Sequence, residues 1–285
     1  RSLPPGSSVV ESASESMLEM IALMKQRKEK ALQKQKATTT TTTAAATTAK
    51  KKLICDGEMA GGGPNLAEGI LQRLQRDGYK SYVKYLTDDR LSWVLHCPGW
   101  CKMDRDSFNA LWELHPEEFN EIMMFGKRVK IPRWQQAYGQ SYSFSGATAI
   151  AMEKPPKDVA GLMERVNDLI SCFKFKMALL NWYAPDHYLG PHHDDVKQLV
   201  KGSPIVSMSW GQTRSFRLIK DKKRPSVGAI NTTIDLRDGD LLLMSWGLNV
   251  THKHEVMKLS KSRQVAAGGR INVTMRSFKD LKSKA

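Results

Sequence analysis

The chain has 285 residues, and its 44 lysines and arginines outnumber its 29 aspartates and glutamates, which gives a formal net charge of +15. This length is enough for a full hydrophobic core. No apolar run approaches the roughly 20 residues of a membrane helix, and four cysteines are too few for a disulfide framework. We therefore expect neither a secreted nor a membrane-spanning protein, and the cysteine content favours a reducing compartment.

The positive charge is spread along the whole chain. Residues 1–52 carry 10 basic and 4 acidic side chains, net +6, so residues 53–285 carry +9. A region this basic favours a polyanionic partner, most often nucleic acid. The alternative is a protein that simply avoids its isoelectric point.

Low sequence complexity marks the N-terminal segment. Residues 9–36 could form a helix, but tracts of threonine, alanine and lysine follow at 38–52, and such tracts cannot bury an apolar face. Glycines at 61–63 then precede Pro64, a pattern typical of a flexible joint. We expect residues 1–64 to be a disordered basic tail and linker.

Two amphipathic helices are predicted next. Leu66, Ile70 and Leu74 fall at helical spacing ahead of a stop signal at residues 77–78. A second helix begins after the prolines at 155 and 156 and carries a similar apolar face.

Beyond Phe173 the apolar period changes from helical spacing to two. Strands are predicted at 173–183, 204–210, 214–219, 240–246 and 270–278, separated by turn residues. Helices followed by a series of short strands predict an α+β fold whose β part is a sandwich, a barrel or a jelly roll.

The last predicted strand alternates cleanly between apolar and polar residues. One face carries Ile271, Val273 and Met275, and the other carries Arg270, Asn272, Thr274 and Arg276. Because guanidinium groups bind carboxylates in a bidentate fork, the polar face is suited to a dicarboxylate or a phosphate. The two arginines are about 20 Å apart along an extended strand, so they could share a small ligand only by leaning together. A solvent-facing strand edge is the alternative.

A second polar feature ends the strand predicted at 173–183. Its period places Phe173, Phe175, Met177 and Leu179 on one face, which continues into Asn181 and Tyr183. An apolar stripe that ends in hydrogen-bonding groups predicts a pocket floor. A buried asparagine satisfied by a neighbouring loop is the alternative.

A candidate metal site follows in Gly190-Pro191-His192-His193-Asp194-Asp195. A His-x-Asp motif supplies two ligands of the facial triad of non-haem Fe(II) oxygenases, and it occurs here in two overlapping registers, His192/Asp194 and His193/Asp195. The third ligand would be a distant histidine, and His252 or His254 is suitably placed. His-x-Asp alone is most often a surface loop, but the combination with a later histidine and an arginine-bearing strand is far more specific.

Together these motifs resemble the AlkB family of Fe(II)- and 2-oxoglutarate-dependent dioxygenases over about residues 107–278. The resemblance rests on Asn181-Trp182-Tyr183, His192-His193-Asp194, His254 and the R-x-N-x-T-x-R pattern from Arg270 to Arg276. Residues 131–133, 137–139, 142–146 and 202–205 are similar to the branch that repairs alkylated bases in duplex DNA. Trp182 and Pro191 depart from common family residues, and neither departure removes a functional atom.

The resemblance implies a double-stranded β-helix (jelly-roll) core at 174–280, preceded at 65–173 by helices, a nucleotide-recognition lid and a finger. It selects His192, Asp194 and His254 as the iron ligands and catalytic residues. It implies Fe(II) as cofactor, with 2-oxoglutarate and O2 as cosubstrates. The 2-oxoglutarate would meet Arg270 at its distal carboxylate, supported by Asn181, Tyr183, Asn272, Thr274 and Arg276.

The implied reaction is oxidative demethylation of bases of the 1-methyladenine and 3-methylcytosine type in DNA, with release of formaldehyde, succinate and CO2. The target base must leave the duplex stack to reach the iron. The resemblance assigns substrate contacts to Phe125, Gly126, Lys127, Arg133, Tyr142, Ser143, Phe144 and Asp195.

Within this set, Phe125 belongs to an apolar finger at 124–127, a segment that would otherwise suggest a buried helix end. The lysines and arginines at 127–133 are expected to meet phosphates. We also expect a monomer that acts in the nucleus on duplex DNA and does not bind membranes.

Two other functions stay open at this point. The first is an AlkB-type demethylase that acts on RNA or single-stranded DNA. The second is a basic DNA-binding module that has lost catalysis. Cys97 and Cys101 could suggest zinc, but two thiols without a second pair are more often unligated.

Overall fold

The computed structural model describes residues 62–124, 126–144 and 147–279. Of the tail predicted for residues 1–64, residues 1–61 lie outside the described residues. The described helices are α2 (Pro64–Arg76), α3 (Arg105–Trp112), α4 (Lys157–Leu169), α5 (Trp246–Thr251) and α6 (Lys261–Gln264). None of these helices combines the length and the apolar character that a membrane span requires.

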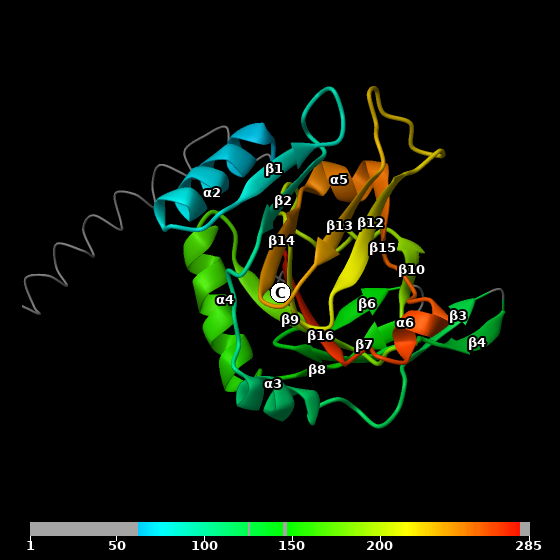
Figure 1. The fold of residues 1–285 in the computed structure, drawn as a ribbon. Helices are drawn as coiled ribbons and strands as arrows, with labels where there is room; N and C mark the ends of the chain where they lie inside the picture. The colour runs from blue at the N-terminus through cyan, green and yellow to red at the C-terminus, as the bar shows by residue number, and fades with distance from the viewer. Residues whose placement is uncertain (1–61, 125, 145–146, 280–285) are drawn as a thin grey trace, which may run out of the picture. The chain divides into compact units, whose positions relative to one another are not determined.

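Two sheets form the body of the fold (Figure 1). The large sheet has eight strands in the order β1 (Tyr82–Tyr85), β2 (Trp93–Cys97), β14 (Asp240–Met244), β11 (Ile205–Gly211), β16 (Arg270–Ser277), β9 (Phe175–Tyr183), β5 (Trp134–Tyr138) and β8 (Ala151–Met152). The small sheet has four strands in the order β10 (Leu189–His192), β15 (His252–Val256), β12 (Arg214–Lys220) and β13 (Thr232–Leu236). Two hairpins complete the set, β3–β4 (Glu121–Met124, Lys127–Lys130) and β6–β7 (Tyr142–Phe144, Ala147–Ala149).

The large sheet is covered on both faces. Helices α2 and α4 pack on one face, where Leu66, Ile70 and Val166 join a core with strand residues such as Leu180 and Val273. The small sheet packs on the other face through a second cluster formed by β12, β13, β14 and β15. Figure 1 shows the two helices on one side of the large sheet and the small sheet on the other. This arrangement confirms the predicted α+β class with a jelly-roll core.

Local sequence explains where α2 begins and ends. Pro64 lies at the first helical turn, where its missing N–H costs nothing, and Leu66, Ile70 and Leu74 are buried on one face. After Asp77 the chain leaves the helix through Gly78, whose φ of +87° lies in the left-handed region that glycine adopts without strain. The helix predicted after the two prolines is α4.

The five predicted strands are present as β9, β11, β12, β14 and β16, with ends within two residues of the predicted ones. Four further strands of the large sheet, β1, β2, β5 and β8, come from the segment 65–173 and have no clear period-two signal. They extend the sheet on both sides of the predicted strands.

One predicted strand face is wrong in its first half. The pairing of β16 with β9 shifts where Arg276 faces Met177 and Ser277 faces Phe175, so Lys176 is an extra residue in a bulge. Phe175 therefore packs with Leu180 in the helix-side core, as does Phe173, which precedes the strand. From Met177 onward the alternation places Leu179, Asn181 and Tyr183 on the opposite face, as predicted.

The finger segment is a β-hairpin and not a helix end. Met124 pairs with Lys127, and Gly126 has a φ of +76°. Phe125 lies outside the described residues. Its neighbour Met123 is 53% exposed, which removes the interpretation of this segment as a buried end of a helix.

Candidate metal centre

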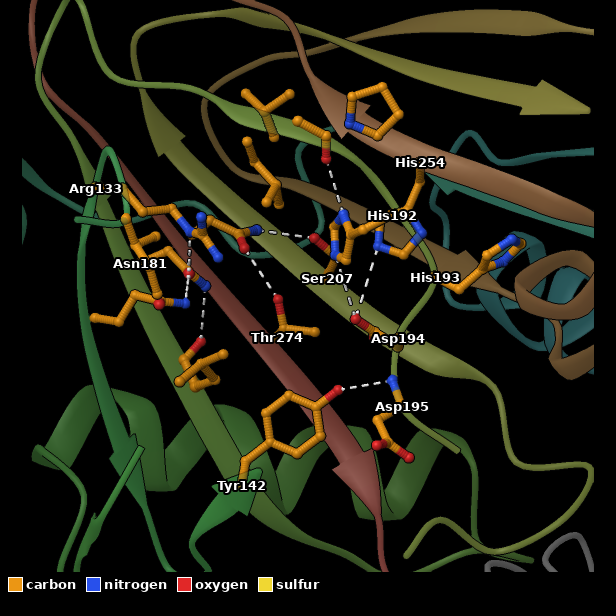
Figure 2. Close-up of a pocket in the computed structure, with 18 of the residues that line it drawn as sticks. Arg133, Tyr142, Asn181, His192, His193, Asp194, Asp195, Ser207, His254 and Thr274 are labelled. Atoms are coloured by element: carbon orange, nitrogen blue, oxygen red, sulfur yellow. Dashed lines mark hydrogen bonds and ion pairs between the residues drawn. The ribbon is translucent and has the colours of Figure 1, made fainter. Parts of the chain in front are cut away.

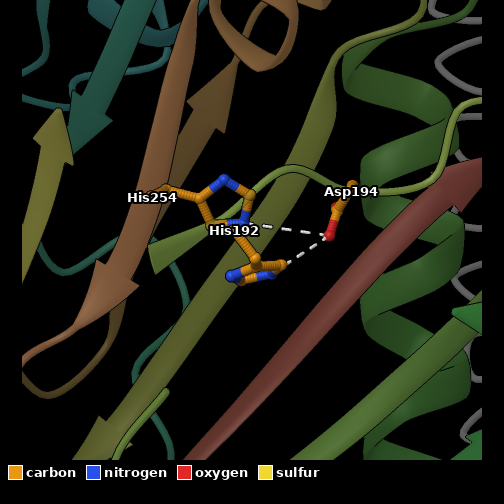
Figure 3. A group of neighbouring side chains, drawn as sticks. All are labelled: His192, Asp194 and His254. Carbon is orange, nitrogen blue, oxygen red and sulfur yellow. Dashed lines mark ion pairs between the residues drawn. The ribbon is translucent and has the colours of Figure 1, made fainter. Parts of the chain in front are cut away.

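Two neighbouring strands of the small sheet bring the candidate ligands together. His192 on β10 and His254 on β15 are directly opposite in the antiparallel ladder, and their ring centroids are 4.2 Å apart. Asp194 follows β10 by two residues and turns its Oδ1 toward both rings, 3.5 Å from His192 Nε2 and 3.8 Å from His254 Nε2. The three ligand atoms lie within 4.8 Å of one another (Figure 3).

The charges of this group suit a divalent cation. Burial would raise the pKa of Asp194, but Arg276 and the two histidines hold it well below its usual range, so the carboxylate is anionic. Burial and the repulsion of His192 lower the pKa of His254 to about 3, against the opposing effect of Asp194. His254 is therefore a neutral imidazole at physiological pH, the form that binds metals.

Hydrogen bonds orient the ligand atoms. The Nδ1 of His192 donates to the carbonyl of Gly190 at 3.0 Å, so in the neutral ring the Nε2 lone pair is left for a metal. Arg276 donates to Asp194 Oδ2 from Nε at 2.9 Å and from Nη2 at 2.7 Å. This leaves Oδ1 for the cation. Two imidazoles and one carboxylate are the ligand set of non-haem Fe(II) sites, so these residues fit Fe(II).

The geometry resolves the alternatives left open by the sequence. Both ring nitrogens of His193 face other acceptors, the carbonyl of Asn249 at 2.6 Å and the carboxylate of Asp221 at 2.9 Å. His252 is fully buried and contacts Thr251 and the carbonyl of Ile230. Neither histidine points toward Asp194, so the cluster is His192, Asp194 and His254.

A cavity of about 860 Å³ lies between the two sheets, with the cluster in its wall (Figure 2). The polar residues of β16, Arg270, Asn272, Thr274 and Arg276, all line it. The apolar residues of the same strand lie in the core behind them. The predicted alternation of β16 is thus present, and its polar face is not a solvent-facing edge.

Arg270 is a buried cation at one end of the cavity. It is 1% exposed, its Nη2 donates to Ser209 Oγ at 2.9 Å, and its guanidinium carbon lies 4.9 Å from the centre of the Tyr183 ring. Burial lowers the pKa of Arg270 to about 10, so it remains charged at physiological pH. Its Nε and Nη1 find no hydrogen-bond partner within the described part of the chain. An unpaired buried guanidinium fits a carboxylate of a bound ligand.

Hydrogen bonds join other polar side chains of the cavity wall on β16, β11 and β9. Thr274 Oγ1 donates to Asn272 Oδ1 at 3.0 Å, and Asn272 Nδ2 donates to Ser207 Oγ at 2.8 Å. On β9, Asn181 Oδ1 accepts from Arg133 Nε at 2.9 Å and from Gln135 Nε2 at 2.8 Å. The side chains predicted to support 2-oxoglutarate thus share one wall, and Arg276 in addition binds Asp194.

The predicted substrate residues do not all lie at the cavity. Tyr142 and Asp195 lie at the cavity, and the Tyr142 hydroxyl accepts from the Asp195 backbone N–H at 3.1 Å (Figure 2). Gly126 and Lys127 lie on the exposed hairpin. Ser143 is not among the cavity-lining residues, and its hydroxyl lies 3.0 Å from Thr148 Oγ1. The side chain of Phe144, like Phe125, lies outside the described residues.

Arg133 differs from its expected place. The sequence predicts that it meets phosphates together with Lys127, Arg128 and Lys130. In the structure it is 7% exposed, and its Nε donates a hydrogen bond to Asn181 Oδ1 in the cavity wall. Lys127, Arg128 and Lys130 on β4, in contrast, are exposed.

Sequence analysis did not single out four residues that hydrogen-bond to this site: Ser207, Ser209, Asn249 and Gln135. The two serines had a readable signal, because they alternate on β11 with the core residues Val206, Met208 and Trp210. Gln135 and Asn249 had none, since their roles depend on which strands and helices meet in space.

Comparisons with known proteins agree with this geometry. The 2OG-Fe(II) oxygenase superfamily matches residues 114–276. The chain is 36% identical over 168 residues to the Bos taurus protein named DNA oxidative demethylase ALKBH2, a match that covers 55% of this chain and 57% of that protein. Its Homo sapiens counterpart is 35% identical over 168 residues, covering 55% and 60%.

The chain therefore spans less than two thirds of the length of these relatives. Among solved structures, that of OsALKBH1 matches with a TM-score of 0.42 and 20% identity, over 65% of this chain and 96% of that one.

The buried pair of Asp194 and Arg276 gives a stability prediction. Arg276→Met should lower the free energy of unfolding of the metal-free protein by about 3–5 kcal/mol, because it leaves a buried carboxylate without its guanidinium. Urea unfolding in the presence of a chelator measures this. The double variant Asp194→Asn, Arg276→Met should lose less than the sum of the two single changes. Strict additivity would show that the two groups do not interact.

Proposed function

Since the chain belongs to the 2OG-Fe(II) oxygenase superfamily, we propose that it is a DNA repair dioxygenase that oxidatively demethylates N-alkylated bases such as 1-methyladenine and 3-methylcytosine. The single observation that carries the proposal is the His192–Asp194–His254 cluster in the wall of a cavity that is also lined by Arg270, a buried guanidinium with no acidic partner among the described residues. The relatives named DNA oxidative demethylase confirm the resemblance to the AlkB family and supply the substrate class.

The protein's part in the reaction is to hold and orient. His192, Asp194 and His254 would bind Fe(II), which supplies the oxidation of the methyl group with 2-oxoglutarate and O2 as cosubstrates and yields succinate, CO2 and formaldehyde. Arg270 would bind the distal carboxylate of 2-oxoglutarate, with Nη1 as a donor that has no partner among the described residues. Asn181, Tyr183, Asn272 and Thr274 line the space between this carboxylate and the metal ligands.

A methylated base must be extruded from the helix to enter the cavity. The volume of about 860 Å³ is sufficient for a base together with 2-oxoglutarate. Tyr142 and Asp195 lie on the metal side of this space and would contact the edge of the base. By the family resemblance, Phe144 and His192 would stack on the two faces of the base.

The β3–β4 hairpin supports duplex DNA as the substrate. Its Lys127, Arg128 and Lys130 are exposed, while Ile122 and Val129 of the same hairpin line the cavity. Phe125, which lies between the two strands in sequence, would enter the gap that the flipped base leaves, and the basic residues would meet phosphates. A nuclear location and action as a monomer belong to the same proposal.

The two other functions are weaker. An inactive DNA-binding module would not need a buried carboxylate that faces two imidazoles, as Asp194 faces His192 and His254. An enzyme for RNA or single-stranded DNA would keep the metal centre but would not need the exposed hairpin, so activity on duplex DNA separates it from the proposal.

The reaction is tested directly with an oligonucleotide that contains 1-methyladenine. With Fe(II) and 2-oxoglutarate, the protein should release formaldehyde and restore adenine. Asp194→Ala should abolish both because it removes the anionic ligand. Omission of 2-oxoglutarate is the control. Turnover by Asp194→Ala at the wild-type rate would contradict the assignment of Asp194 as a metal ligand.

The cosubstrate site is tested at Arg270. Arg270→Ala should raise the apparent KM for 2-oxoglutarate about 10- to 100-fold, since charge-assisted hydrogen bonds contribute about 1.5–3 kcal/mol. Steady-state kinetics with saturating DNA measures the change. Arg270→Lys keeps the positive charge but cannot form a bidentate contact, so its KM for 2-oxoglutarate should lie between those of the wild type and Arg270→Ala. An unchanged KM in both variants would contradict the assignment.

The finger is tested by comparing substrates. Phe125→Ala should lose far more activity on a methylated duplex than on the same methylated single strand, because only the duplex has a stacked gap to fill. Met123→Ala is the control, because Met123 is a neighbouring apolar side chain that is 53% exposed. Equal losses of activity on both substrates, with a large fall in melting temperature, would show that Phe125 is a core residue and not a finger.

A further inference from the structure

We propose that Asn249 is a positioning residue for the metal site, which holds the main chain of Asp194 so that its carboxylate meets the two histidines. The inference rests on the role of Asp194 as a metal ligand in the proposed function. The family resemblance gave Asn249 no role.

Asp194 lacks the backbone support that the other two ligands have. His192 and His254 are paired in the β10–β15 ladder, which fixes their main chains. Strand β10 ends at His192, and the segment that contains Asp194 is neither strand nor helix. A ligand on such a segment is free to turn unless another group holds its peptide.

The side chain of Asn249 supplies that support. Its Oδ1 accepts from the Asp194 N–H at 2.9 Å, and its Nδ2 donates to the Asp194 carbonyl at 3.1 Å. The amide thus binds both main-chain groups of one residue, as a neighbouring strand would. Asn249 is 3% exposed, so water does not compete for these bonds.

The position of Asn249 connects the two halves of the metal site. It lies on the short helix α5, which leads directly into β15 and His254. Its own carbonyl accepts from His193 Nδ1, and His193 Nε2 in turn contacts Asp221. Residues 193 and 194 are therefore both bonded to Asn249. The side chain of Asp194 is held separately, by Arg276 from β16.

Loss of the amide should therefore weaken metal binding more than it weakens the fold. Partners that orient metal ligands typically contribute 10- to 100-fold to metal affinity. We expect Asn249→Ala to raise the Kd for a divalent metal by this factor. Asn249→Asp, which has the same size and keeps only the acceptor, should also raise it.

The chain provides a matched control in Asn167. Its amide makes the same pair of bonds to one residue, since Nδ2 donates to the Phe175 carbonyl at 3.0 Å and Oδ1 accepts from the Phe175 N–H at 2.7 Å. Asn167 lies on α4 and Phe175 begins β9, so this pair supports the helix side of the large sheet. Asn167→Ala should lower the melting temperature and leave metal affinity unchanged.

The experiment is a titration of the metal-free full chain with Co(II), followed by visible absorption in the absence of O2. The melting temperature of each metal-free variant is measured alongside. A 10- to 100-fold increase in Kd for Asn249→Ala, with wild-type affinity for Asn167→Ala, supports the proposal. If Asn249→Ala does not fold, Asn249→Asp takes its place in the same comparison.

Two results would overturn the proposal: wild-type Co(II) affinity in the Asn249 variant, or an equal loss of affinity in Asn167→Ala. A wild-type chain that binds no Co(II) would overturn it as well. The titration needs no DNA, so its outcome is separate from the demethylase assay. A chain that binds Co(II) in this way but releases no formaldehyde would fail the proposed function and leave the role of Asn249 standing.

Discussion

The burial of the Asp194 carboxylate is the constraint on which the site depends. The Asp194 side chain is 3% exposed, and an isolated charge in that position would be strongly unfavourable. Arg276 compensates one oxygen, and the other oxygen faces two imidazoles that cannot both be protonated without repelling each other. Burial, together with the neighbouring His192, lowers the pKa of His254. A divalent cation satisfies all three groups at once, because it pairs with the carboxylate and uses the lone pairs of the neutral rings.

The two sheets carry different parts of the chemistry. The small sheet contributes both histidines through one cross-strand pair, while the large sheet contributes the polar wall and the buried Arg270. Because strand side chains alternate, the large sheet can place apolar residues against the helices and polar residues into the cavity from the same strands. Arg270 is buried without an acidic partner among the described residues, and its Nη1 has no hydrogen-bond partner there. This is the feature on which the proposed site for the distal carboxylate of 2-oxoglutarate rests.

Sequence alone could predict what depends on local periodicity. The alternation in β16 indicated which face holds Arg270 and which face holds Val273, and the structure agrees. The same rule failed at Phe175, because one extra residue at Lys176 reverses the face and nothing in the local pattern signals the bulge. Sequence spacing also could not decide whether His252 or His254 completes the metal cluster. The choice depends on the register of β10 against β15, a contact between segments about 60 residues apart.

The positions that sequence could not indicate are those that hold other site residues in place. Gln135 binds the Asn181 side chain, and Asn249 binds the Asp194 peptide, each from an element far away in the chain. A ligand type has a chemical signature, whereas a positioning residue needs only one hydrogen-bonding group at the right point in space. Many residue types can supply such a group, so the sequence carries little information about it. The cost of losing it is nevertheless large, because the orphaned partner is buried and has no water to replace the bond. The accuracy of the metal site thus depends on residues that have no role in the chemistry itself.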